Sequence, residues 1–106
     1  MPAVYDGFVT AMGAEIQSLV HSVSLEGEYD LSRRDEVAAL FGALDGNGPA
    51  IVDMAKVTYV DSSFLYELVA LRSRLKEWGV TLRGVQPPIR RVFQITSLHR
   101  LFSIPE

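Results

Sequence analysis

An apolar stripe in the second half of the chain constrains its fold more than any other feature. Its members recur at the spacing of one helix face: Phe64, Leu68, Leu71, Leu75 and Trp78. This spacing predicts a helix from about Ser62 to Trp78, and Gly79 stands where such a helix would end. A stripe of this length has to be buried against another layer of structure.

Short strand patterns alternate with helical ones along the rest of the chain. Residues 23–26 alternate as a half-buried strand that Gly27 is expected to end, and residues 50–54 are apolar enough for a central strand. We expect a loop from there to Asp61. Residues 80–83 alternate again, and residues 101–104 are expected to form a last short strand.

Two further helices are expected between these strands. Ser32 is the predicted N-cap of the first, with Asp35 as its capping-box partner. Its apolar face is predicted to consist of Val37, Leu40, Phe41 and Leu44. Pro87 and Pro88 can open the second. Its buried face is predicted to consist of Ile89, Val92, Phe93 and Thr96. Strands alternating with helices predict an α/β fold with a largely parallel sheet.

Length and composition place the chain among small globular domains. Its 106 residues suffice for one domain, and 48% hydrophobic residues with a net charge of −3 exclude a largely disordered chain. No apolar run approaches the roughly 18 residues of a membrane helix, and no signal peptide is visible. The absence of cysteine excludes disulfides and thiol chemistry and fits a cytoplasmic protein.

Charge is unevenly distributed along the chain. Residues 1–71 carry 11 acidic and 3 basic side chains, whereas residues 72–106 carry 2 acidic and 7 basic ones. This asymmetry could steer a charged protein partner, or the two signs could mingle on the folded surface. Core-type apolar residues interrupt the basic part, which disfavours nucleic-acid binding.

Motifs of common enzymes are missing. His21 and His99 show no metal-ligand spacing, and no Gly-x-Ser-x-Gly, Gly-x-Gly-x-x-Gly or phosphate-binding loop is present. A phospho-acceptor receiver domain would need a late lysine, but none follows Lys76. We therefore expect no catalytic residues, no cofactor and no metal ion.

The segment Asp61-Ser62-Ser63 is the most informative polar motif, because it stands at the start of the predicted stripe helix. One interpretation is purely structural, with one of these residues serving as the N-cap. The other is that a serine accepts a phosphate, which adds close to two negative charges where a helix start tolerates them. Phosphorylation would then change binding without unfolding the domain.

Four segments in this order resemble the STAS domain family, whose best-known members are bacterial anti-sigma factor antagonists. They are Gly27–Leu31, Ala50–Met54, Val57–Ser63 and Arg90–Leu98 with Leu101-Phe102, and the resemblance spans about residues 19–104. We expect a single STAS domain over residues 1–106, in which residues 1–18 form an N-terminal segment that could supply a first strand. The resemblance implies a mixed sheet of four to five strands, with helices mainly on one face.

The resemblance also implies a partner-switching mechanism without enzymatic activity. An unphosphorylated antagonist binds an anti-sigma factor, which is a histidine-kinase-like ATPase that phosphorylates serine, and thereby frees the sigma factor for transcription. Phosphorylation, implied here at Ser62, releases the antagonist, and a serine phosphatase resets it. The implied partner-binding residues are Asp30, Asp61, Ser62, Ser63 and Phe64.

Two points stay open at the level of sequence. Phe64 replaces a glycine common in the family, so it could pack in the core or offer an apolar anchor to the partner. The domain could also be a non-phosphorylated docking module of a transporter or a stress-sensing complex. We expect a monomer or weak homodimer, with no membrane or nucleic-acid partner.

Overall fold

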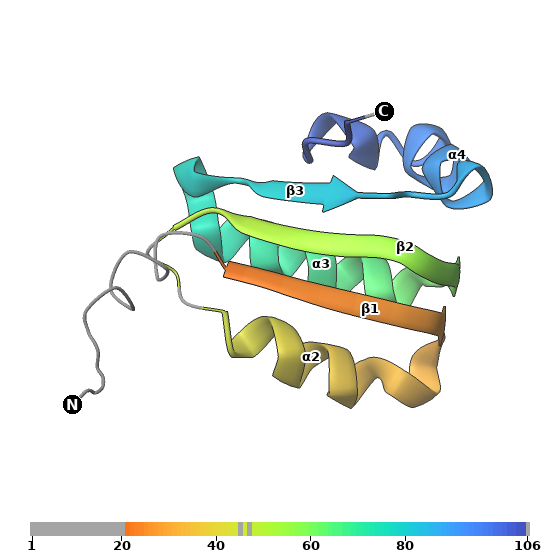
Figure 1. The fold of residues 1–106 in the computed structure, drawn as a ribbon, viewed down its shortest axis with the longest axis horizontal. Helices are drawn as coiled ribbons and strands as arrows, with labels where there is room; N and C mark the ends of the chain where they lie inside the picture. The colour runs from red at the N-terminus through yellow and green to blue at the C-terminus, as the bar shows by residue number, and fades with distance from the viewer. Residues whose placement is uncertain (1–20, 45, 47, 106) are drawn as a thin grey trace.

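The computed structural model describes residues 21–44, 46 and 48–105, and Figure 1 shows its ribbon. In chain order the elements are β1 (His21–Tyr29), η1 (Leu31–Arg33), α2 (Arg34–Gly42), β2 (Ala50–Val60), α3 (Ser62–Leu75), η2 (Lys76–Trp78), β3 (Val80–Arg83), α4 (Pro87–Ile95) and η3 (Leu98–Arg100). The strand expected within residues 1–18 lies outside the described residues. The α/β class predicted from the alternating patterns is confirmed.

The sheet has the strand order β1-β2-β3, and both neighbouring pairs are parallel. This corrects the expected mixed sheet of four to five strands, since the described residues form three. The strand predicted at residues 101–104 is absent because the chain there leaves the η3 turn, and only Ser103 pairs with the sheet, through an isolated bridge to Thr81.

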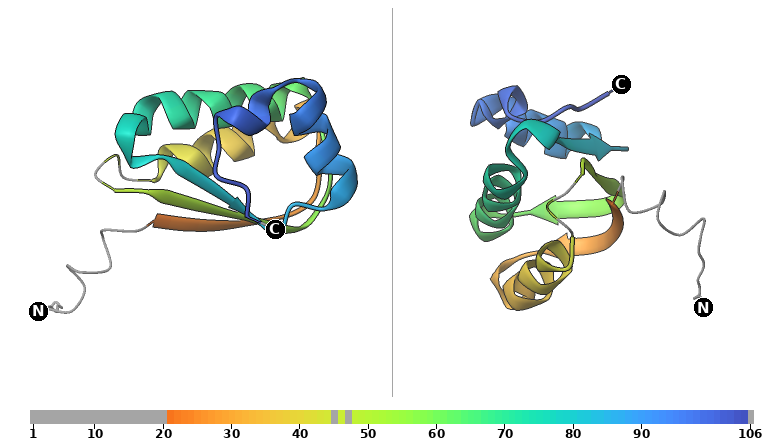
Figure 2. Two further views of the ribbon diagram at one scale, coloured as in Figure 1. Left: turned by 90° about the horizontal axis from the view of Figure 1, so that it is seen from above. Right: turned by 90° about the vertical axis from the view of Figure 1, so that its left-hand side faces the viewer.

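The two helices α2 and α3 lie side by side on one face of the sheet (Figure 2). Between these layers the stripe residues Phe64, Leu68, Leu71 and Leu75 are buried against strand residues such as Val52. On the β3 side of the sheet lie α4 and η3 (Figure 1), where Phe93 packs edge-on against Phe102 with ring centroids 5.9 Å apart. No described helix covers the opposite face of the sheet.

The strand β2 is longer than the sequence pattern predicts. It runs on to Val60, so the loop expected after Met54 is wrong. Two register shifts against β1 insert an extra residue into β2 each time, and they interrupt the alternation of buried and exposed residues. The strand β1 likewise continues past Gly27, which was expected to end it and instead adopts φ of 92° within the strand.

The helices lie where the apolar stripes predict them, but some of their ends and one cap differ from the predictions. The cap before α2 is Asp30, whose side chain accepts a hydrogen bond from the backbone N–H of Ser32, and α2 itself begins only at Arg34. The prediction of Ser32 as N-cap is therefore wrong. The stripe helix α3 ends at Leu75, and η2 carries the chain to Gly79, which has φ of 81°.

Candidate functional site

The Asp-Ser-Ser motif lies at the carboxyl edge of the sheet, where β2 ends and α3 begins. The parallel strands β1 and β2 end together, with Tyr29 opposite Val60. The backbone N–H of Asp61 donates to the carbonyl oxygen of Tyr29 at 3.2 Å. The structure therefore brings Asp30, which follows β1, to the same edge as Asp61 and the two serines.

The carboxylate of Asp61 caps α3. Its Oδ1 accepts hydrogen bonds from the backbone N–H groups of Ser63 and Phe64, at 3.0 and 3.1 Å, and from the Ser63 hydroxyl at 2.7 Å. The bond from the Ser63 hydroxyl, followed by the backbone N–H bonds, lowers the pKa of Asp61 below its ordinary value. A fixed negative charge therefore adjoins Ser62 at neutral pH.

The two serines of the motif have different environments. Ser63 is half-buried and its hydroxyl is committed to Asp61. Ser62 is exposed, and its hydroxyl forms no hydrogen bond with any residue that the structure describes. Because the cap is complete without it, the Ser62 hydroxyl can react or bind without breaking a contact that holds the helix.

The side chain of Phe64 is only 2% exposed. Its ring lies 5.4 Å from that of Tyr29 and 6.1 Å from that of Phe41, measured between centroids. This corrects the assignment of Phe64 as a partner-binding residue, because the first turn of α3 directs the ring into the core rather than to solvent. Of the two roles left open for this side chain, core packing is the one found.

A depression of about 370 Å³ adjoins the exposed serine. Arg34, Ser62, Ser63 and Tyr66 line it, and we call it the Ser62 depression. The guanidinium of Arg34 lies 5.9 Å from the ring centroid of Tyr66, and its Nε lies 3.4 Å from a carboxylate oxygen of Glu67. A cation from α2 thus lines the same depression as the exposed serine of α3.

Exposed apolar side chains accompany this depression. Tyr66 is 65% exposed, and Leu31, which directly follows Asp30, is 66% exposed. Sequence reasoning missed Leu31, Arg34 and Tyr66. The spacing of four residues between Ser62 and Tyr66 is a signal for Tyr66, but nothing in the sequence places Arg34 of another helix next to them.

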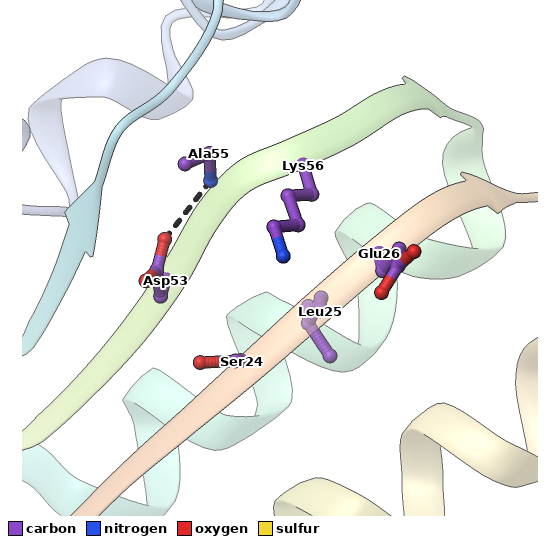
Figure 3. A pocket seen from close by; sticks show the side chains of 6 residues that line it. All are labelled: Ser24, Leu25, Glu26, Asp53, Ala55 and Lys56. Carbon is purple, nitrogen blue, oxygen red and sulfur yellow. Dashed lines mark hydrogen bonds between the residues drawn. The ribbon is translucent and has the colours of Figure 1, made fainter.

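A second hollow, of about 180 Å³, lies on the open face of the sheet at the first register shift (Figure 3). Charged side chains of both signs line it, from Glu26, Asp53 and Lys56. Asp53 already accepts a hydrogen bond from the backbone N–H of Ala55 at 3.0 Å. The described residues contain no group of three or more potential metal ligands. The Ser62 depression is therefore the stronger candidate site.

None of the described helices combines the length and the apolar character needed to span a membrane.

Comparison with known proteins assigns the family. A family model described as "Mlab, STAS domain" matches residues 12–104. No match is found among curated proteins.

Solved structures share the fold. An anti-sigma factor antagonist from Mycobacterium paratuberculosis is 27% identical, with a TM-score of 0.73 over 81% of this chain and 76% of that one. The anti-sigma factor antagonist SpoIIAA in its unphosphorylated form is 18% identical, with a TM-score of 0.65 over 84% and 81% of the two chains. A sulfate transporter family protein from Wolinella succinogenes is 13% identical, with a TM-score of 0.65 over 76% and 69%.

These matches agree with the α/β fold described above, in which helices accompany a parallel sheet. The family model covers most of the chain, including the candidate site. The chain therefore belongs to the STAS domain family.

Proposed function

We propose that this protein is an anti-sigma factor antagonist that works by partner switching. Unphosphorylated, it binds an anti-sigma factor that is a histidine-kinase-like ATPase, and phosphorylation of Ser62 releases it. The observation that carries the proposal is the Ser62 hydroxyl, which is exposed and makes no hydrogen bond within the described part of the chain. A residue used only as a cap would have its side chain bonded to the helix start, as Asp61 does.

The modification fits the local chemistry. The kinase transfers the terminal phosphoryl group of ATP to Ser62 Oγ: the new O–P bond replaces the bond to ADP, and the hydroxyl proton passes to a base or water. The product carries close to two negative charges next to the Asp61 carboxylate. The positive end of α3 tolerates this charge, so the fold persists while the surface changes.

The surroundings of Ser62 suit a protein partner. Leu31 and Tyr66 offer exposed apolar area, and such side chains contribute strongly to interfaces when a partner buries them. A phosphate on Ser62, which lines the depression together with Tyr66, would have to lose its water on binding, which is costly for a charged group. Phosphorylation at this position therefore weakens the complex directly.

The relatives support this proposal over an enzymatic role. Two of the similar structures are anti-sigma factor antagonists, and SpoIIAA has been solved both unphosphorylated and phosphorylated. By analogy we place this chain in the cytoplasm, with a serine phosphatase to reset it. We propose that it acts as a monomer or weak homodimer.

Affinity capture from the source cell's lysate tests the proposal, with three baits read by mass spectrometry. The baits are the wild type, Ser62→Asp and, as a matched control, Ser73→Asp, which adds the same charge to an exposed serine farther along α3. We expect the wild type and the control to recover a histidine-kinase-like ATPase and Ser62→Asp to lose it. Undiminished capture by Ser62→Asp would contradict the switch.

A second candidate is a docking module of a transporter complex. It is favoured by the structural similarity to a sulfate transporter family protein. In this case wild type and Ser62→Asp recover the same transporter or scaffold subunits. Incubating the recovered subunits with ATP and the wild type would then leave Ser62 unmodified in the peptide mass spectrum.

A further inference from the structure

We propose that Arg34 is the internal ligand of the phosphate on Ser62, and that it turns from Glu67 to the phosphate when Ser62 is modified. The inference rests on the proposed function, because it concerns the phosphorylated state of the same serine. It adds a residue that none of the sequence motifs contains and a reason why the modified surface differs in shape as well as in charge.

The position of Arg34 carries the first step. Ser62 and Tyr66 stand one turn apart on the same face of α3. The Arg34 guanidinium lies 5.9 Å from the Tyr66 ring centroid, and both Arg34 and Ser62 line the Ser62 depression. A phosphate on Ser62 Oγ therefore projects into a space that this guanidinium already borders.

The present contacts of Arg34 are weak. Its ion pair with Glu67 is 3.4 Å long, and half of the Arg34 side chain is exposed. The neighbouring Arg33 contrasts with it, because two of its nitrogens bind both carboxylate oxygens of Glu36, at 3.0 and 2.7 Å. An exposed single contact is screened by water and adds little. Arg34 can therefore change partner, whereas Arg33 is held.

Charge makes the phosphate the better partner. A phosphoserine carries close to two negative charges and three acceptor oxygens, which a planar guanidinium can bind through paired N–H groups. The carboxylates near this edge are Asp30, Asp61 and Glu67, and the neighbouring cation Arg33 is already paired with Glu36. Arg34 is thus the cation that lines the Ser62 depression, and it would offset the repulsion between the phosphate and these carboxylates.

The change of partner alters the binding surface. When Arg34 lies against the phosphate, its side chain crosses the Ser62 depression and the Glu67 carboxylate loses its ion pair. A partner that fitted the open depression beside Tyr66 would then meet a covered one. Phosphorylation would in this way remove the site by shape and by charge together.

Phosphorus NMR on the full chain tests the contact without any kinase, using protein synthesised with phosphoserine in place of Ser62. The second ionisation of the phosphate is titrated in otherwise wild-type protein, in Arg34→Gln and in Arg91→Gln. Arg91 is an exposed arginine on α4 and serves as the control. Asp30, Asp61 and Glu67 are unchanged in all three proteins, so the comparison isolates the arginine.

We expect Arg34→Gln to raise the pKa of the phosphate by about one unit, because it removes a nearby opposite charge, and Arg91→Gln to leave it unchanged. The same phosphate pKa in all three proteins would overturn the proposal. In the otherwise wild-type protein, the Nε–H resonance of Arg34 should also shift on phosphorylation, a readout that needs no arginine variant. Neither readout depends on the lysate partner, so failure of the capture experiment and failure of this contact are distinguishable.

Discussion

Two turns at the carboxyl edge of the sheet are built alike, one after β1 and one after β2. Each has the pattern Asp-x-Ser, in which the aspartate accepts hydrogen bonds from the backbone N–H and the hydroxyl of the serine two residues on. The middle residue is exposed in both turns: Leu31 in the first and Ser62 in the second. In each turn, hydrogen bonds therefore fix the aspartate and the serine, and the exposed middle residue is available for contacts at the surface.

The two turns differ at their fourth residue. After Asp61 this residue is Phe64, which enters the core, and α3 begins at once. After Asp30 it is Arg33, which stays at the surface and ends η1 directly before α2. The comparison teaches that the exposed serine stands on the turn that is tied more firmly to the core.

Removing the Phe64 ring should have the largest effect on stability, because burial of this ring is what distinguishes the second turn from the first. We expect Phe64→Ala to lower the free energy of unfolding by about 3–5 kcal/mol, the usual loss for a buried aromatic ring. Urea denaturation followed by circular dichroism measures it. Tyr66→Ala, which truncates an exposed ring on the same helix, should stay within about 0.5 kcal/mol. Similar losses for both variants would mean that Phe64 is not a core residue.

Removing the two aspartates compares the caps directly. Asp61 accepts two backbone N–H bonds at the start of the 14-residue helix α3, whereas Asp30 accepts one at the short η1. We expect Asp61→Ala to lower the melting temperature by about twice as much as Asp30→Ala, in proportion to the backbone bonds lost. Differential scanning calorimetry of both variants checks this order. A larger loss for Asp30→Ala would reverse the proposed ranking of the turns.

The charge of Asp61 should make part of the stability depend on pH. Its pKa in the folded protein is below the ordinary value of 3.8, so folding favours the ionised form. This stabilisation is complete above the ordinary value and is lost as the pH falls through the lower folded-state pKa. Asp61→Asn keeps a capping oxygen but loses the charge. The free energy of unfolding of this variant should therefore lie below that of the wild type by a constant amount near neutrality, and the difference should shrink in acid. A difference that does not depend on pH would contradict this.

The smallest effects should separate the two serines. Ser63→Ala removes the hydroxyl bond to Asp61 and should cost about 0.5–1.5 kcal/mol. Ser62→Ala removes a hydroxyl without a partner among the described residues and should change stability by less than about 0.5 kcal/mol. Chemical denaturation of the pair measures the difference. A clear loss of stability in Ser62→Ala would mean that Ser62 has a structural role.

Sequence reasoning located the helices through their apolar faces. The stripe from Phe64 to Leu75 is buried as predicted, because its spacing fits one helix face over three turns. Its last predicted member, Trp78, lies beyond the helix in η2 and is 48% exposed. The strand β3 was found for the same reason, since its four residues alternate regularly. The stripe also placed the Asp-Ser-Ser motif correctly at the start of α3, whereas the strand before it was expected to end at Met54.

The errors arose where the backbone departs from a regular period. The two extra residues in β2 shift its buried positions to Val57 and Val60, so the pattern after Met54 no longer alternates and its second half was interpreted as a loop. Gly27 was taken as a strand end, although its positive φ lies within β1. The contact between Arg34 and Tyr66 joins residues of different helices, and no local pattern records it.

The contacts of Arg33 also bear on how this domain avoids aggregation. The outer strand of a sheet exposes backbone groups to which another chain can add a strand. In β1 the Arg33 guanidinium binds the carbonyl oxygens of Glu26 and Glu28, at 2.8 and 3.2 Å, and the Tyr29 hydroxyl accepts the Glu26 N–H at 3.0 Å. The half of β1 nearest Ser62 is thus closed to strand addition. The proposed exchange of partners can then use side chains at this edge, without offering the backbone to every unfolded chain nearby.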